Sequence, residues 1–192
     1  LAESFLDGAD MCLILGDNIF FGKNFKDKLV EACKSKNQSI FVKRVDTPEK
    51  YGVLQFHKSK PIKIIEKPKK FISDYAVTGI YFYNNSSIKI AKKIKPSKRN
   101  EKEISELNQI LLSKRNLKVI KLGKEVYWHD AGDHNEYLTT CIEIKNYEKK
   151  YNVILGSIEY ESIKNKFLKK SKFKKNILNN NFYYKKVLKF LK

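Results

Sequence analysis

The sequence has few of the features that mark membrane, secreted or zinc-binding proteins. It contains no apolar run of about 18 residues, so we expect no membrane-spanning helix. Its first residues, LAESFLDGAD, are acidic instead of basic and then apolar, and we expect no signal peptide. Cys12, Cys33 and Cys141 are far apart and form no CxxC pair, which argues against a zinc site. Three free thiols fit a reducing compartment and predict a cytoplasmic protein.

Methionine is almost absent from the chain. Met11 is the single methionine, and the sequence begins at Leu1, inside a predicted helix. We therefore expect the sequence to be a piece of a longer protein. Its 192 residues suit one domain. We expect an α/β part over residues 1–150 and a basic helical segment over residues 151–192 that packs on the same domain.

Acidic residues are scarce relative to basic ones. The chain has 40 Lys and Arg against 21 Asp and Glu, which gives a formal net charge of +19. Such a charge favours polyanions, so a nucleic-acid-binding protein is one hypothesis. The excess is spread along the chain, however, and the recognised nucleic-acid-binding motifs are absent. We therefore expect no specific nucleic acid partner and no membrane partner.

Strand and helix patterns alternate along the chain. Apolar runs and period-two patterns predict strands, and an apolar face at helical spacing predicts a helix near Glu103–Lys114. The longest predicted strand is Tyr75–Tyr83, which is rich in aromatic and β-branched residues. Alternating elements of this kind predict an α/β fold with a mixed, mostly parallel sheet sandwiched by helices.

Two acidic turns follow predicted strands. Met11–Leu15 is a short apolar run typical of a strand buried on both faces, and Asp17 follows it. Asp130 follows a second predicted strand, Glu125–Trp128. If the two strands are neighbours, both carboxylates can bind one Mg²⁺, which prefers hard oxygen ligands and bridges to phosphates. The alternative is that Asp17 only caps a turn or the next helix.

A second group of residues suits a sugar phosphate. Glu66 and Lys67 stand together at a predicted strand end, where Glu66 can accept hydrogen bonds from hydroxyls and Lys67 can meet a phosphate. The same pair is also common on protein surfaces. Gly52 would let a ligand approach the main chain, and Gly79 indicates close approach of a backbone or a ligand inside a strand.

Six motifs in one order resemble a known family, the glucose-1-phosphate thymidylyltransferases. They are LGDNIFFG, RVDTPEKYGVLQF, IIEKP, YAVTGIYFY, KPSKRNEKEIS and YWHDAGDH. The resemblance covers essentially the whole chain. It implies a nucleotide-diphospho-sugar transferase fold and a Mg²⁺-dependent reaction of dTTP with glucose 1-phosphate. The products would be dTDP-glucose and pyrophosphate. The family also implies a homotetramer and a place in dTDP-rhamnose-type deoxysugar and polysaccharide synthesis.

The resemblance also implies roles for individual residues. Asp17 and Asp130 match the family's two metal-binding carboxylates, and together with Lys67 and Arg99 they are the expected catalytic residues. The positions that match substrate contacts are Tyr51, Gly52, Glu66, Lys67, Val77, Arg99 and Trp128.

One departure from the family concerns the triphosphate. The family's N-terminal Gly-rich loop, which cradles the triphosphate, has no match in this sequence, so we expect a fold that is incomplete at the N-terminus. We also expect the 192 residues to lack turnover by themselves. Two further hypotheses stay open: a nucleotidyltransferase that uses UTP or another sugar phosphate, and a non-catalytic remnant that binds a sugar phosphate.

Overall fold

The computed structural model describes residues 3–97, 100–176 and 181–191. Its internal contacts divide the chain into two compact units, Leu1–Gly132 and Asp133–Lys192, and each is described by itself. The second unit includes the long helix α5 (His134–Tyr151) together with the C-terminal helices. The predicted division into domains at residues 150 and 151 stays a prediction.

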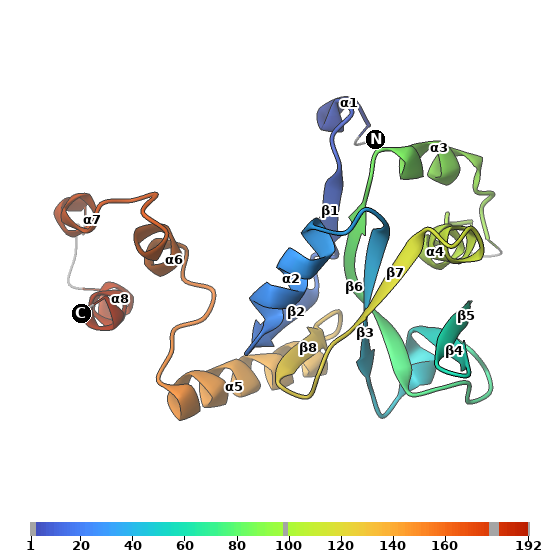
Figure 1. Cartoon of the computed structure of the whole chain (residues 1–192). Helices are drawn as coiled ribbons and strands as arrows, with labels where there is room; N and C mark the ends of the chain where they lie inside the picture. The colour runs from blue at the N-terminus through green and yellow to red at the C-terminus, as the bar shows by residue number, and fades with distance from the viewer. Residues whose placement is uncertain (1–2, 98–99, 177–180, 192) are drawn as a thin grey trace. The chain divides into compact units, whose positions relative to one another are not determined.

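The first unit is built on a mixed sheet (Figure 1). Its strands run in the order β5-β4-β6-β3-β7, and β1 also pairs with β6. The strand bounds are β1 Met11–Ile14, β3 Gln38–Arg44, β4 Gly52–His57, β5 Lys60–Glu66, β6 Tyr75–Tyr83 and β7 Leu117–Lys121. A separate pair joins β2 (Asn18–Gly22) to β8 (Val126–Asp130) in antiparallel fashion.

The α/β class and the mixed sheet are confirmed, but the expectation of mostly parallel pairing is wrong. Among the described pairings, β3 with β7 is parallel, and the others are antiparallel. The reason lies in the connections. A two-residue turn joins β4 to β5, and so short a link permits only an antiparallel hairpin, because a parallel pair needs a crossover of about a dozen residues.

Helices cover both faces of this sheet. Along β3, Ile40 and Val42 point to one face and Phe41 to the other, as strand alternation requires. Ile40 and Val42 pack with Leu107 and other residues of α4, whereas Phe41 packs with residues of α2 and β8. The helices of this unit are α1 Glu3–Leu6, α2 Phe25–Cys33, the short 3₁₀ turn η1 Pro48–Lys50, α3 Ser86–Lys93 and α4 Ile104–Ser113.

Strand β1 is not the doubly buried strand that its apolar sequence predicted. The exposed fractions of Leu13, Ile14 and Leu15 are 39%, 52% and 40%. Strand β1 pairs along one edge with β6, and within the described residues no strand pairs with its other edge. The apolar run therefore predicted the strand itself correctly. It could not predict how many neighbouring strands would cover it.

The second unit is helical. It contains α5 His134–Tyr151, α6 Ile158–Lys164, α7 Lys170–Asn176 and α8 Phe182–Phe190. Its small core is formed by Ile154, Phe173 and Val187.

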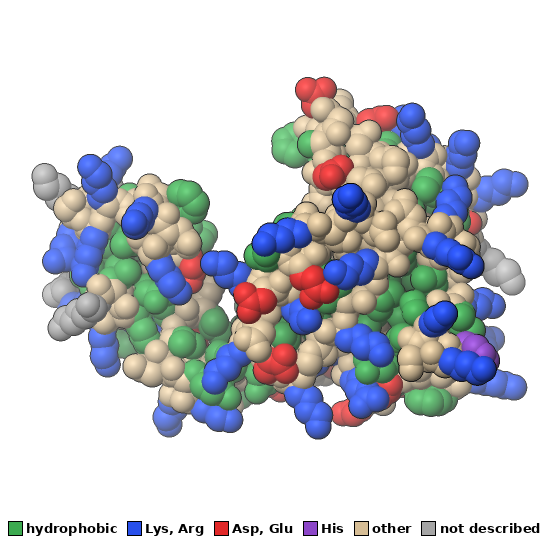
Figure 2. All heavy atoms as spheres, in the orientation of Figure 1, with side chains coloured by type: hydrophobic (Ala, Val, Ile, Leu, Met, Phe, Trp, Pro, Cys, Tyr) green, Lys and Arg blue, Asp and Glu red, His purple; other side chains and the backbone are tan. Residues whose placement is uncertain are grey.

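No helix in the described parts of the chain combines the length and the apolar character that a membrane crossing requires. Figure 2 shows Lys and Arg side chains scattered over the visible face of the molecule instead of gathered in one patch.

Candidate functional site

A pocket of about 210 Å³ opens in the first unit beside the central strand β6. On one edge, β6 pairs with β4 at Ala76 and with β1 from Ile80 to Tyr83. Between these two pairings no strand pairs with this edge of β6, although the Leu15 N–H still donates to the Gly79 carbonyl oxygen at 2.9 Å, and Val77 and Gly79 line the pocket there. Strands β4 and β1 pair with the same edge of β6, and the pocket lies in the interval between them.

The floor of the pocket comes from one face of β6. Val77, Gly79 and Tyr81 alternate along the strand, so they point to the same side. Burial raises the pKa of Tyr81 well above its ordinary value, and the negative charges of Glu66 and Asp130 raise it further. The raised pKa keeps the phenol neutral.

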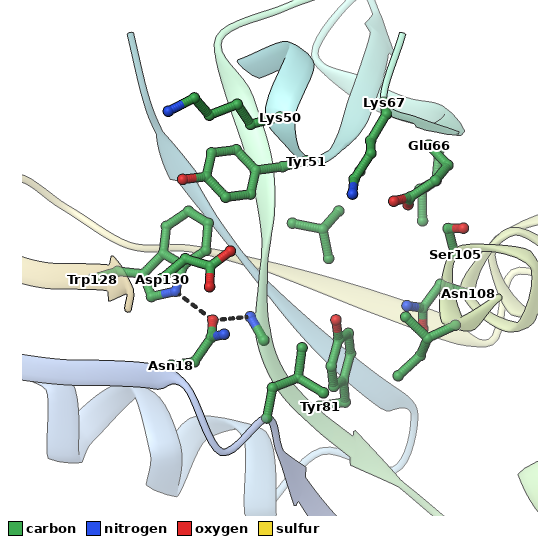
Figure 3. A pocket seen from close by; sticks show the side chains of 16 residues that line it. Asn18, Lys50, Tyr51, Glu66, Lys67, Tyr81, Ser105, Asn108, Trp128 and Asp130 are labelled. Carbon is green, nitrogen blue, oxygen red and sulfur yellow. Dashed lines mark hydrogen bonds between the residues drawn. The ribbon is translucent and has the colours of Figure 1, made fainter. Parts of the chain in front are cut away.

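One wall of the pocket carries charge. Strand β5 ends at Glu66, and Lys67 follows in the left-handed region with φ 42°, a conformation that costs a non-glycine residue about 1 kcal/mol or more. The backbone N–H of Lys67 donates to the carbonyl oxygen of Tyr51 at 3.0 Å. Figure 3 shows the Lys67 ammonium and the Glu66 carboxylate pointing into the pocket. Within the described residues, neither side chain forms a hydrogen bond or an ion pair.

The opposite wall is aromatic. The rings of Tyr51 and Trp128 pack with their centroids 5.0 Å apart, and both residues line the pocket. Trp128 Nε1 donates a hydrogen bond of 2.6 Å to Asn18 Oδ1, which Figure 3 shows as a dashed line. The structure also explains why a glycine suits position 52: a Cβ there would lie 3.1 Å from the Glu66 carboxylate. Its role is to make room for a side chain of the site.

The two acidic turns lie side by side. The pairing of β2 with β8 sets Asn18 opposite Asp130, and the N–H of Ala131 donates to the carbonyl oxygen of Asp17 at 2.8 Å. A Cβ at Gly132 would lie 3.3 Å from Asp17 Oδ2 and 3.4 Å from Asp130 Oδ1. Both carboxylates therefore face one small space that glycine leaves open. Their strands are β2 and β8, however, not β1 and β8 as expected.

This space suits a hard cation. Two carboxylates fit Mg²⁺, which usually takes one or two protein oxygens and completes its shell with water and substrate phosphates. No group of three or more His, Cys, Asp or Glu in the described residues could hold a metal alone. The metal assignment of Asp17 and Asp130 stays a prediction.

The pocket brings together most of the residues predicted from sequence. Its lining includes Tyr51, Gly52, Glu66, Lys67, Val77, Trp128 and Asp130. Asp17 does not line the pocket itself but adjoins it through Gly132 and Asp130. Arg99 lies outside the described residues. The roles of these residues stay predictions.

Sequence reasoning missed several residues of the lining. Ser105 and Asn108 lie one helical turn apart on α4, and Asn108 is fully buried, accepting a hydrogen bond from the Tyr83 hydroxyl at 2.7 Å. The sequence signal that could have indicated Asn108 is its place next to the apolar positions of this helix. Lys50, next to Tyr51, and Asn18, next to Asp17, were also missed, although each adjoins a predicted residue.

Comparison with known sequences identifies the family. Residues 1–146 match the family described as Nucleotidyl transferase. The chain is 35% identical over 174 residues to a glucose-1-phosphate thymidylyltransferase of Neisseria meningitidis, covering 90% of this chain and 60% of that protein. It is 41% identical over 136 residues to a protein of the same name from Xanthomonas campestris, covering 70% of this chain and 46% of that protein. The chain thus spans at most about 60% of the length of these relatives.

Comparison with solved structures agrees. A Bacillus anthracis protein described as a candidate glucose-1-phosphate thymidylyltransferase, solved with sucrose, is 35% identical and superposes with a TM-score of 0.63 over 72% of this chain and 55% of its own. A UDP-glucose pyrophosphorylase solved with UDP-glucose reaches 0.66 at 20% identity over 78% of this chain and 60% of its own, and that likeness shows the fold alone. The motif order, the pocket and the match over residues 1–146 lead to one conclusion. The chain belongs to the nucleotidyl transferase family.

Proposed function

We propose that this chain provides the sugar-phosphate site of an enzyme that makes dTDP-glucose from dTTP and glucose 1-phosphate. The observation that carries the proposal is the composition of the pocket. The side chains of Glu66 and Lys67, which form no hydrogen bond or ion pair within the described residues, stand across it from the rings of Tyr51 and Trp128. An ammonium and a carboxylate beside an aromatic wall match a ligand that carries phosphate, hydroxyls and an apolar ring face.

Each wall would hold a different part of the substrate. The Lys67 ammonium would donate to the phosphate, and Glu66 would accept hydrogen bonds from sugar hydroxyls. The aromatic rings would cover the sugar ring and exclude water. Val77 and Gly79 would support the sugar from the floor of the pocket. Arg99, by resemblance, would also reach the phosphate.

The proposed reaction needs no covalent intermediate on the protein. A phosphate oxygen of glucose 1-phosphate attacks the α-phosphorus of dTTP, the bond to the bridging oxygen breaks, and pyrophosphate leaves with that electron pair. The chain's own contribution would be to hold the attacking phosphate in line and to balance its charge through Lys67. Asp17 and Asp130 would hold Mg²⁺, which supplies charge stabilisation at the phosphates when bound.

We propose further that the 192 residues bind the sugar phosphate without catalysing transfer alone, because none of their motifs is a Gly-rich triphosphate loop. The homotetramer and the deoxysugar pathway implied by the family belong to the same proposal. A uridylyl donor or a purely binding role are the alternatives that an experiment must separate.

The test combines a binding assay with a turnover assay. Equilibrium dialysis with glucose 1-phosphate should show saturable binding, and glucose 6-phosphate should compete weakly. With Mg²⁺ and either dTTP or UTP, the same chain should release no pyrophosphate. Equal binding of both sugar phosphates would overturn the proposed site. Release of pyrophosphate would overturn the binding-only part, and the preferred triphosphate would then identify the donor.

A further inference from the structure

The side chain of Asn18 joins three separate parts of the site. Asn18 is the first residue of β2, and in the antiparallel pair of β2 with β8 it lies opposite Asp130. Its Oδ1 accepts hydrogen bonds from Trp128 Nε1 at 2.6 Å and from the N–H of Gly79 at 3.0 Å. Its Nδ2 donates to Asp17 Oδ1 at 2.9 Å. Figure 3 shows the amide between Trp128 and the floor of the pocket.

Only a side-chain amide of this length can make all three bonds. An amide oxygen has two lone pairs and can accept from two donors, while the amide nitrogen donates. An aspartate would keep both acceptor bonds but would lose the donor and place a second negative charge beside Asp17. A leucine would fill a similar volume and make none of the bonds.

The strand beneath leaves room for this amide. A Cβ at Gly79 would overlap the Asn18 side chain. At Gly79 the carbonyl oxygen accepts from the Leu15 N–H, whereas the Gly79 N–H donates to Asn18 Oδ1, so the amide supplies the acceptor that a paired strand would otherwise provide. The Asn18 amide therefore takes the place of a neighbouring strand at Gly79.

We propose that Asn18 is a positioning residue: it fixes the plane of the Trp128 ring and orients the Asp17 carboxylate, so that the aromatic wall and the acidic turn keep one relative placement. The Trp128 ring packs on Tyr51, and a rotation of the indole would move the wall against which a ligand lies. The consequence for sugar-phosphate binding rests on the proposed function. The consequence for Trp128 itself does not.

The chain provides a direct probe, because Trp128 is its single tryptophan. The indole N–H of ¹⁵N-labelled protein gives one resonance, and its chemical shift and exchange rate report the bond to Asn18. In Asn18→Leu this resonance should move and its exchange should accelerate. In Asn18→Asp the indole bond is retained, so the resonance should keep its slow exchange. Asn116→Leu, in the same unit but away from the pocket, is the matched control and should match the unmodified protein.

Binding provides the second readout. Asn18→Leu should weaken glucose 1-phosphate binding about 10- to 100-fold, the range found when a supporting partner of a site residue is removed. Asn18→Asp should retain most of that affinity. An unchanged indole resonance in a folded Asn18→Leu variant would overturn the positioning role. If Asn18→Leu fails to fold, accelerated indole exchange in Asn18→Asp would overturn it instead. A normal indole response without any glucose 1-phosphate binding in the unmodified chain would overturn the proposed function alone.

Discussion

The two walls of the pocket are built in opposite ways. On the aromatic side, Trp128 is tied through the Asn18 amide to Gly79 and Asp17 by hydrogen bonds that need no ligand. The wall of Glu66 and Lys67 presents charged groups that have no hydrogen bond or ion pair within the described residues. The difference separates two tasks. One wall is rigid and sets the geometry, and the other keeps its charges available for a ligand.

This division has a physical basis. A charged group that is already paired must give up that partner when it binds a ligand, so uncommitted charges bind more effectively. A recognition surface also costs less to order when its own side chains are fixed in advance. Variants that alter one wall at a time separate the two tasks.

The acidic turn on the rigid side should give the largest effect. Asp17→Asn or Asp130→Asn removes one of the two carboxylates that face the space beside Gly132. In a form of the protein that turns over, kcat should fall about 100-fold or more, because metal-assisted charge stabilisation supplies several kcal/mol. The rate of pyrophosphate release in Mg²⁺ measures kcat, and Asp46→Asn is the control variant, which should keep the unmodified rate. Near-normal turnover would refute the metal assignment.

The charged wall should affect binding without affecting stability. Lys67→Ala removes the ammonium and should weaken glucose 1-phosphate binding about 10- to 100-fold, the value of one hydrogen bond to a charged group. The free energy of unfolding should change by less than about 0.5 kcal/mol, since Lys67 has no side-chain partner among the described residues. Lys63→Ala, on strand β5, which ends just before Lys67, but outside the pocket, should change neither quantity. A large loss of stability would show that this wall is also structural.

The rigid wall should show the reverse pattern. Gly79→Ala would push the Asn18 amide away and leave the donors of Trp128 and residue 79 without their acceptor. The free energy of unfolding in urea should fall by about 1–3 kcal/mol. Gly16→Ala is the control, because a Cβ at Gly16 has no neighbour within 4 Å. Equal stability of the two variants would mean that the hydrogen bonds of Asn18 contribute little.

Alkaline pH should give the smallest effect, at the floor between the walls. Burial, with the charges of Glu66 and Asp130, raises the pKa of Tyr81 above its ordinary value. A group whose folded-state pKa is raised contributes stability below its unfolded pKa, near 10, and loses it as the pH rises further. By pH 11 this loss should reach about 1 kcal/mol. Tyr81→Phe should lose less stability between pH 9 and 11, and identical pH profiles would contradict the shift.

Much of the fold could be predicted because local patterns are strong. Tyr75–Tyr83 is a strand with the predicted bounds, since its aromatic and β-branched residues favour no other structure. Helix α4 was also predicted within a residue at each end. Strand direction could not be predicted in the same way, because pairing depends on contacts between distant segments. For the same reason, the exposed edge of β1 was not visible in its apolar sequence.

The site was predictable where a motif resembles the family's. Glu66 and Lys67 form a pair that is common on protein surfaces, and the resemblance of the IIEKP motif singled it out; the pocket contains both residues. Asn18 did not stand out, because its importance comes from reaching Gly79 and Trp128, residues that are 61 and 110 positions away in sequence. Only the folded arrangement shows that one amide serves three partners.

The most direct test of the two-wall account is a titration of ¹⁵N-labelled protein with glucose 1-phosphate, followed by NMR. A sugar phosphate bound between the walls should cause saturable shifts at the Trp128 indole and at the amides of Val77, Gly79 and Lys67. Lys67→Ala should remove the saturation within the same concentration range. Shifts confined to the helices of residues 133–192, or none at all, would contradict the claim that a sugar phosphate binds between these walls.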